Sequence, residues 1–240
     1  MAHQTELQAF EDQKRYEEFN RRPFIRAIRQ EFERILQQHS FLDKTVLEIG
    51  CAAASFEKEC HGARFIVSSD LNLHLLKNNS GPKAVCDGEF ASFKDRSFHI
   101  IILSGVLHHY SDQERGLREL KRLRAPGGTI LMVEPRTKSL NSFYRLLRRI
   151  ALKALTPKQL GAVIGCYSPD ESLVDEERIA AAFRDGYRVC MSRKFCLRFP
   201  PLPLLRRFGA DVAVSRWLDR FSLLNRFGTM LFATIQERPC

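Results

Sequence analysis

The sequence predicts an α/β domain built on a doubly wound, mostly parallel sheet of seven strands. Short apolar runs rich in β-branched residues recur along the chain, and most of them end in small or acidic residues. Segments of helical composition or loop separate these runs. Near-continuous apolar strands that alternate with helices indicate a parallel sheet covered on both faces. The predicted strands are 45–50, 63–70, 82–87, 98–105, 128–135, 187–197 and 229–237.

A helical N-terminal addition, residues 1–40, is predicted to precede this sheet and to serve as a lid. Pro23 suits the first turn of its second helix, because a residue at that position needs no backbone N–H. Apolar residues follow at roughly helical spacing. They are Phe24, Ile25, Ile28, Phe32, Ile35 and Leu36. Residues 41–240 are predicted to form the main domain.

Two segments of the main domain, 139–170 and 198–228, are predicted to be additions on the substrate side of the sheet. The first begins with a basic helix, and a further helix is expected to start near Ser172. The second holds a proline-rich turn and then an amphipathic helical insertion before the last strand. Elsewhere, Gly62 is expected to end the first crossover helix, and the Ala-Pro-Gly-Gly segment 125–128 to end the fourth.

The composition favours a cytoplasmic protein. No apolar run approaches the ~20 residues that cross a bilayer. The N-terminal segment is polar and carries both signs of charge, unlike a signal peptide. The seven cysteines are an odd number without a CxxC pair, which argues against a disulfide framework and against a zinc site. We therefore expect reduced thiols.

The formal net charge of +10 is concentrated in one part of the chain. Residues 1–135 hold 19 Lys and Arg against 19 Asp and Glu, whereas residues 136–228 hold 18 against 8. The predicted basic helix, about 139–155, and the insertion both place cations beside apolar residues. These cations are Arg145, Arg148, Arg149, Lys153, Arg206, Arg207, Arg216, Arg220 and Arg226. The concentration of charge predicts a local basic surface and an anionic partner.

Functional residues are expected where the strands end, because ligands of open parallel sheets bind beyond the carboxyl ends of the strands. A turn of small residues, Gly50-Cys51-Ala52, follows the first strand and lets backbone amides approach an anionic group. Asp70 ends the second strand and can accept both hydroxyls of a ribose. Asp87 ends the third and can accept from an adenine amino group. Any one acid at a strand end can be only a helix cap, but together they favour a nucleoside-shaped ligand.

Three segments carry a resemblance to a known family: VLEIGCAAASFEKE (46–59), the segment around Asp70, and the stretch from Asp87 to Pro135. In the last stretch an acid, a phenylalanine, paired histidines and PGG follow in a fixed order. Over residues 40–136 the chain resembles the class I S-adenosylmethionine-dependent methyltransferases. It is most similar to the branch that includes the ubiquinone and menaquinone methyltransferases.

The resemblance implies a Rossmann-like fold, methyl transfer as the reaction and S-adenosylmethionine as the cofactor. It implies that Glu48 and Gly50 line the methionine end of the cofactor. It also implies that Asp70 holds the ribose hydroxyls, with Leu71 beside the adenine.

The same resemblance gives roles to residues after the third and fourth strands. Asp87 and the backbone of Gly88 would receive the adenine amino group, and Ser104 would border the sulfonium. His108 and His109 would face the substrate, where a histidine suits a general base because its ordinary pKa lies near neutrality. Alternatively, these histidines only cap the junction before the next helix.

One departure from the family leaves cofactor binding open. Ala52 and Ala54 stand where glycines are usual, and a methyl group narrows the room for close backbone approach. Ala52 is tolerable if its φ is negative, and Ala54 can begin the following helix. A nicotinamide-binding site is disfavoured, because its G-x-G-x-x-G pattern here reads Gly50, Ala52 and Ser55.

We therefore expect a methyltransferase that acts on a small-molecule or lipid-like acceptor by in-line transfer. Aromatic and leucine residues of the additions favour a lipophilic or aromatic acceptor. They are Phe195, Phe199, Leu202, Leu204, Leu205, Phe208, Trp217, Phe221 and Phe227. A nucleic-acid methyltransferase that uses the basic region is the second hypothesis, and a non-catalytic methyltransferase-like binding protein is the third. The cationic insertion also predicts weak, salt-sensitive attachment to anionic membranes.

Overall fold

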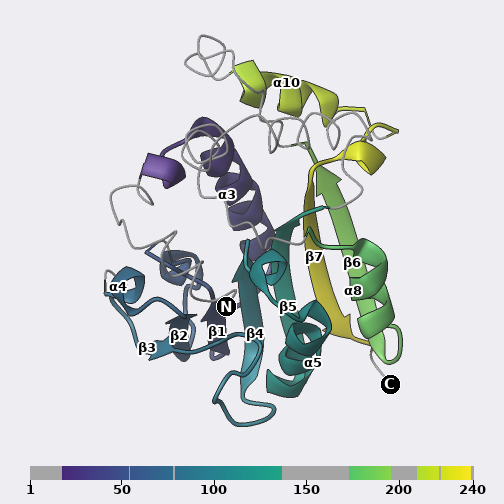
Figure 1. Ribbon diagram of the computed structural model, residues 1–240. Helices are drawn as coiled ribbons and strands as arrows, with labels where there is room; N and C mark the ends of the chain where they lie inside the picture. The colour runs from purple at the N-terminus through teal and green to yellow at the C-terminus, as the bar shows by residue number, and fades with distance from the viewer. Residues whose placement is uncertain are drawn as a thin grey trace.

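Seven strands form a single sheet in the order β3-β2-β1-β4-β5-β7-β6 (Figure 1). The computed structural model describes residues 18–53, 55–77, 79–136, 173–195, 210–221 and 223–238. The strands are β1 Thr45–Ile49, β2 Phe65–Asp70, β3 Lys83–Val85, β4 Phe98–Ser104, β5 Arg124–Pro135, β6 Tyr187–Lys194 and β7 Met230–Glu237. All neighbours are parallel except that β7 runs antiparallel to β5 and β6. The predicted doubly wound, mostly parallel sheet of seven strands is confirmed.

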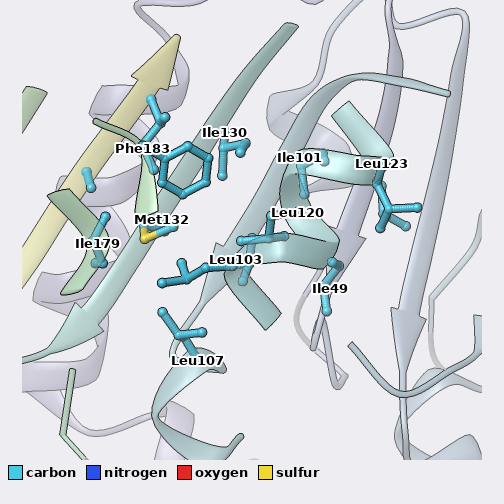
Figure 2. Close-up of a cluster of buried hydrophobic side chains, with 14 of the residues drawn as sticks. Ile49, Ile101, Leu103, Leu107, Leu120, Leu123, Ile130, Met132, Ile179 and Phe183 are labelled. Carbon is cyan, nitrogen blue, oxygen red and sulfur yellow. The ribbon is translucent and has the colours of Figure 1, made fainter. Parts of the chain in front are cut away.

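Helices cover both faces of this sheet. They are α3 Pro23–Leu36, α4 Leu73–Leu76, α5 Gln113–Leu123, α8 Glu176–Ala182 and α10 Ala210–Leu218, with 3-10 turns at Glu57–Glu59, Leu107–His109 and Asn225–Phe227. Successive residues of β4 point to opposite faces. Ile100 and Ile102 pack with Phe32 of α3, whereas Ile101 and Leu103 join the other core cluster. Figure 2 shows that second cluster, in which α5 and α8 cover the sheet.

Helix α5 illustrates how the sequence fixes such an element. Asp112 is its N-cap, and the Asp112 side chain accepts the backbone N–H of Arg115 at 3.0 Å. Leu117, Leu120 and Leu123 recur every three residues and are buried on the face toward the strands. The helix therefore anchors the loop that precedes it, which follows β4.

Two predicted helix ends were wrong, and two predicted segments are only partly described. The connection from β1 to β2 holds a 3-10 turn, Glu57–Glu59, among its described residues, so Gly62 does not end an α-helix there. The segment 125–128 lies within β5, which begins directly after α5. The predicted helix start at Pro23 is confirmed by α3. The predicted basic helix 139–155 lies outside the described residues, and α10 accounts for part of the insertion 198–228.

The strand order reverses between β1 and β4, which makes this pair the topological switch point. The chain passes from β1 to β2 and β3 on one side and returns to β4 on the other. Ile49 pairs with Ser69 of β2 and with Leu103 of β4. Gly50, Asp70 and Ser104 therefore follow at the same level of the sheet. No helix among the described residues is long and apolar enough to cross a membrane.

Candidate cofactor and acceptor site

The turn after β1 packs closely against the loop after β4. Gly50 has φ +68, and a Cβ atom added there would lie 2.2 Å from Cγ2 of Val106. Glycine is therefore required for the two segments to approach each other at the switch point. The N–H groups of Gly50 and Cys51 donate to the carbonyl of Ser69 at 2.7 and 3.1 Å. These bonds tie the turn to the end of β2.

Ala52 has φ +45, so the negative φ under which its methyl group would be tolerable is not what the structure shows. Its N–H donates to Oδ2 of Asp70 at 2.8 Å, and its carbonyl accepts from Nδ2 of Asn79 at 2.9 Å. A left-handed conformation costs an L-residue about 1–2 kcal/mol. The hydrogen bonds to Asp70 and Asn79 offset that cost and keep the turn in a glycine-like shape. Ala54 lies outside the described residues.

Asp70 holds the backbone of two turns, the one after β1 and the one after β2. While Oδ2 accepts from Ala52, Oδ1 accepts the N–H of Asn72 at 2.8 Å. A carboxylate has about four acceptor positions, so both contacts are compatible with its predicted bonds to ribose hydroxyls. Leu71, the residue predicted beside the adenine, is half-buried and follows directly.

Glu48 lies behind the turn after β1. Its side chain is buried, and its carboxylate accepts from the Ser55 hydroxyl at 2.5 Å and from the N–H of Phe56 at 3.1 Å. Desolvation raises the pKa of Glu48 to about 7, although these hydrogen bonds and Arg29 favour the charged form. Glu48 thus fixes the segment after the turn, and its contact with the methionine end of a cofactor stays a prediction.

The turn after β3 brings Asp87 to the carboxyl ends of the parallel strands, where Asp70 also lies. Val85 pairs with Asp70, so Asp87 lies just beyond the neighbouring strand. Oδ1 of Asp87 accepts the N–H of Glu89 at 2.8 Å, which shapes the turn. A Cβ atom at Gly88 would lie 1.8 Å from the hydroxyl oxygen of Tyr110. The backbone is therefore held tightly where an adenine is predicted to bind.

A buried carboxylate that the sequence analysis missed holds the loop after β4. Glu134, near the end of β5, is 0% exposed, and its Oε1 accepts the N–H groups of Val106 at 2.9 Å and Leu107 at 2.8 Å. Its Oε2 accepts the N–H of His108 at 3.4 Å and lies 2.8 Å from Nδ1 of the same residue. This contact assigns the proton to Nδ1, so the neutral ring carries its lone pair on Nε2.

His108 and His109 form a stacked pair. Their ring centroids lie 3.9 Å apart with the planes tilted by 38°, and the side chain of His108 is 12% exposed. The ring of His108 lies beside Gly105, which has φ +70 and directly follows Ser104. Because Glu134 orients His108, the geometry favours His108 over His109 as a base. Both roles stay predictions.

A second buried carboxylate, Glu89, ties the turn after β3 to the start of α5. It accepts from the N–H of Ser111 at 2.7 Å, the Ser111 hydroxyl at 2.9 Å and the N–H of Asp112 at 3.1 Å. Tyr110 is buried between these segments, and its hydroxyl has no hydrogen-bond partner within the described residues. Burial raises the pKa of Tyr110 well above its ordinary value.

Of the residues missed, Glu134 carried a usable signal. It is an acid at the end of an otherwise apolar strand, as Asp70 and Asp87 are. Nothing in the sequence marks Glu89 or Asn79 as anchors, because their partners are distant in the chain.

The fold defines a class of protein, a Rossmann-like domain, and the ends of its parallel strands carry the predicted nucleoside-binding residues. Two strand-end carboxylates, Asp70 and Asp87, provide acceptors for hydroxyl and amino groups, which suits the adenosine part of S-adenosylmethionine. Gly50 and Gly88 lie where a Cβ atom would collide with a neighbouring loop, so the close packing of the turns after β1 and β3 requires glycine at these positions. The residues present fit the predicted cofactor.

A family model described as a methyltransferase domain matches residues 16–170. The chain therefore belongs to the methyltransferase domain family. Family and fold together confirm the predicted class, the class I S-adenosylmethionine-dependent methyltransferases.

Curated relatives include two kinds of methyltransferase. Demethylmenaquinone methyltransferase of Mycobacterium sp. (strain KMS) is 30% identical over 138 residues, covering 56% of this chain and 58% of the relative. Probable tRNA methyltransferase 9B of Mus musculus is 32% identical over 93 residues, covering 36% of this chain and 21% of the relative. The match thus spans less than two thirds of either relative's length.

Solved structures share the fold. An S-adenosylmethionine-dependent methyltransferase from Mesorhizobium loti superposes with a TM-score of 0.59 at 16% identity, covering 91% of this chain and 99% of that one. A SAM-dependent methyltransferase from Archaeoglobus fulgidus gives 0.56 at 17% identity, covering 88% and 94%. At these identities the likeness concerns the fold alone.

Proposed function

We propose that the protein transfers the methyl group of S-adenosylmethionine to a small lipophilic or aromatic acceptor that carries an acidic hydroxyl. The observation that carries this proposal is the hydrogen-bonded pair of His108 and Glu134. His108 lies just after β4 and Glu134 near the end of the neighbouring β5, at the end of the sheet where Gly50 and Asp70 also lie. A histidine oriented by a carboxylate is an arrangement suited to removing a proton from an acceptor.

S-adenosylmethionine supplies a methyl group activated on a sulfonium, so the chain needs no covalent intermediate. Asp70 would hold the ribose hydroxyls, and Asp87 with the backbone of Gly88 would hold the adenine. The turn that begins at Gly50 would receive the methionine end, and Ser104 would border the reacting centre. Holding both reactants in line is worth about 7–11 kcal/mol in well-oriented systems.

Glu134 determines what His108 can do. Because Nδ1 donates to the carboxylate, Nε2 is the atom that can accept a proton from a phenol or enol. The carboxylate would stabilise the imidazolium that results. The backbone N–H groups of Val106 and Leu107 hold the carboxylate in place, so the pair needs no rearrangement before the reaction. An amine acceptor with a free lone pair would not require this base.

The relatives named demethylmenaquinone methyltransferases support an acceptor of quinol type, which is both lipophilic and hydroxylated. The aromatic residues Trp217 and Phe221 remain exposed in the addition before β7, whereas Phe195 is buried and packs the fold. Phe227 is half-buried, and the other residues predicted to line the pocket lie outside the described residues.

Labelled methyl transfer tests the proposal. Purified chain is incubated with methyl-labelled cofactor and three acceptor sets: reduced demethylmenaquinone with simpler naphthols, small phenols, and total tRNA. We expect label in the first or second set. His108→Gln should lower turnover about 100-fold or more, while the Kd for S-adenosylhomocysteine changes less than about twofold. The matched variant His109→Gln should lose less.

A second candidate, methylation of RNA, is favoured by the basic excess in residues 136–228 and by the relatives named tRNA methyltransferase. Label in the tRNA fraction alone would establish it. Binding of S-adenosylhomocysteine without transfer to any set would instead support the non-catalytic alternative.

A further inference from the structure

The outward face of α10 is apolar and exposed. Val214 and Trp217 lie three residues apart on one face of α10, and Phe221 follows just beyond the end of the helix. These side chains are 36%, 54% and 45% exposed. Leu223, shortly beyond, is 84% exposed. The rings of Trp217 and Phe221 contact each other edge to face with centroids 5.1 Å apart. Single exposed apolar side chains are ordinary, but a cluster marks a binding surface.

The opposite face of α10 holds the helix to the rest of the protein. Ser215 is buried, and Oδ1 of Asp219 accepts the N–H of Phe195 at 2.8 Å. Val212, Ser215 and Asp219, with Arg216 at the rim of this face, also line a cavity of about 60 Å³ between α10 and α3. That volume is far below the 300–1,000 Å³ of a typical small-molecule pocket. Within the described part of the chain, the outward apolar side chains stay largely exposed and do not join either core cluster.

Two arginines border the apolar face. Arg216 lies in α10 and Arg220 in the turn that follows it, and both are exposed. Nη2 of Arg216 lies 3.4 Å from Oε1 of Gln30. Within the described part of the chain, neither guanidinium forms an ion pair with a carboxylate. The face thus presents aromatic and aliphatic side chains beside positive charge.

Helix α10 lies near the carboxyl ends of the parallel strands, which is the end of the sheet that carries the candidate site. β6 is antiparallel to β7, which is antiparallel to β5, so β6 runs in the same direction as β1 and β4. Figure 1 shows α10 beyond the arrowhead of β6 and close to the start of α3. A surface that met this face would lie on the side of the molecule where the parallel strands end.

We propose that this face, defined by Val214, Trp217, Phe221 and Leu223 with Arg216 and Arg220, docks on an anionic lipid bilayer. Trp and Phe favour the membrane interface, and cations beside them contact lipid phosphates. An RNA partner fits less well, because Val214 and Leu223 offer no ring on which a base could stack. The inference deepens the proposed function, on which it rests for its purpose, by naming a bilayer as the source of a lipophilic acceptor.

Trp217 is the only tryptophan of the chain, so the proposed surface carries its own fluorescent probe. The full chain is mixed with vesicles of phosphatidylcholine alone or with phosphatidylglycerol, at low and high salt, without cofactor or acceptor. We expect co-sedimentation with the anionic vesicles at low salt only. Bound protein should show a blue-shifted emission that acrylamide quenches less and brominated acyl chains quench more.

Variants locate the contact. Trp217→Ala/Phe221→Ala should lower the partition coefficient at least tenfold, and each of Arg216→Gln and Arg220→Gln should lower it about fivefold. The matched controls are Phe90→Ala and Arg118→Gln, whose side chains are as exposed but lie in other elements. Thermal unfolding checks that each variant is folded.

Three results would overturn the proposal: no binding to anionic vesicles, binding with unchanged tryptophan emission, or wild-type binding by the folded double variant. A blue shift with tRNA in the absence of vesicle binding would assign the face to RNA. Since no methyl transfer is measured, failure here and failure of the proposed reaction are distinguishable.

Discussion

The turn after β1 and the loop after β4 meet at the switch point, but they are held there in different ways. The turn after β1 depends on Asp70, whose two oxygens accept from Ala52 and Asn72 and which is also the predicted ribose ligand. The loop after β4 depends on Glu134, which is fully buried and accepts three backbone N–H groups from behind. The turn after β1 is held by a predicted ligand-binding residue, and the loop after β4 by a residue that no ligand needs to contact.

This difference separates two proposed tasks of the site, which are binding the cofactor and positioning the base His108. A cofactor that engages Asp70 acts on the same carboxylate that shapes the turn, so cofactor binding and the shape of the turn are coupled. His108 is held by Glu134, which itself accepts the backbone N–H groups of Val106 and Leu107, so the fold sets the geometry of the proposed base. Replacing the two kinds of anchor should therefore produce different losses.

The largest effect is expected from Glu134→Ala. The change leaves the N–H groups of Val106, Leu107 and His108 without their buried acceptor, and each hydrogen bond to a charged group contributes about 1.5–3 kcal/mol. We expect the free energy of unfolding to fall by about 3 kcal/mol or more in urea titrations. Glu114→Ala, at an exposed position of α5, should change it by less than about 0.5 kcal/mol. An equal, small effect of both would mean that Glu134 is not an anchor.

The next effect concerns the pH dependence of Glu48, the buried anchor behind the turn after β1. Its pKa of about 7 when folded exceeds its ordinary value, so the folded state binds the proton more tightly. Stability should therefore fall as pH rises from about 4.5 to 7, by on the order of 3 kcal/mol from this residue. Glu48→Gln cannot ionise and should lose this dependence.

The measurement is the difference in unfolding free energy between Glu48→Gln and the wild type at several pH values. The difference cancels other titrating groups, such as His39, whose pKa burial lowers. We expect the unfolding free energy of the variant, relative to that of the wild type, to increase steadily between pH 4.5 and 7. If the unfolding free energies of the two proteins had the same pH dependence, folding would not raise the pKa of Glu48.

The fold was predictable because its signals are local. The inner strands β1, β4 and β5 are nearly continuous buried apolar runs, and such runs can be recognised in the sequence without knowledge of distant contacts. Asp70 and Asp87 were singled out because an acid ends or shortly follows a predicted strand. Helix α3 was predicted from Pro23 and from the spacing of residues such as Phe32 and Leu36.

The missed features depend on contacts between distant residues. The left-handed φ of Ala52 is maintained by Asp70 and Asn79, which lie 18 and 27 residues away. The pairing of His108 with Glu134 joins positions 26 residues apart. No pattern of spacing within either segment specifies such contacts, so the sequence suggested where a site could lie but not which contacts fix its shape.

A third effect tests whether Asp70 serves ligand and turn together. Asp70→Ala removes the acceptor of two backbone N–H groups and of the predicted ribose hydroxyls. We expect the Kd for S-adenosylhomocysteine to rise about thirtyfold or more, which corresponds to about 2 kcal/mol. Calorimetry measures it, with the exposed Asp185→Ala as control. By contrast, folded Glu134→Gln should bind the cofactor product nearly as the wild type does, and similar losses in both would erase the distinction between the anchors.

The smallest effect is expected at Ala52, where the strain of the turn after β1 is concentrated. Ala52→Gly removes the left-handed cost of about 1–2 kcal/mol but adds about 0.4–1 kcal/mol of unfolded-chain entropy. We expect a net gain in stability of about 0.5 kcal/mol, because the first contribution is the larger. The neighbouring Ala53 does not have a positive φ, so Ala53→Gly carries only the entropic cost and should destabilise by a similar amount. Opposite signs at two adjacent alanines would locate the strain at one residue. The same sign at both would mean that Asp70 and Asn79 hold the turn without strain.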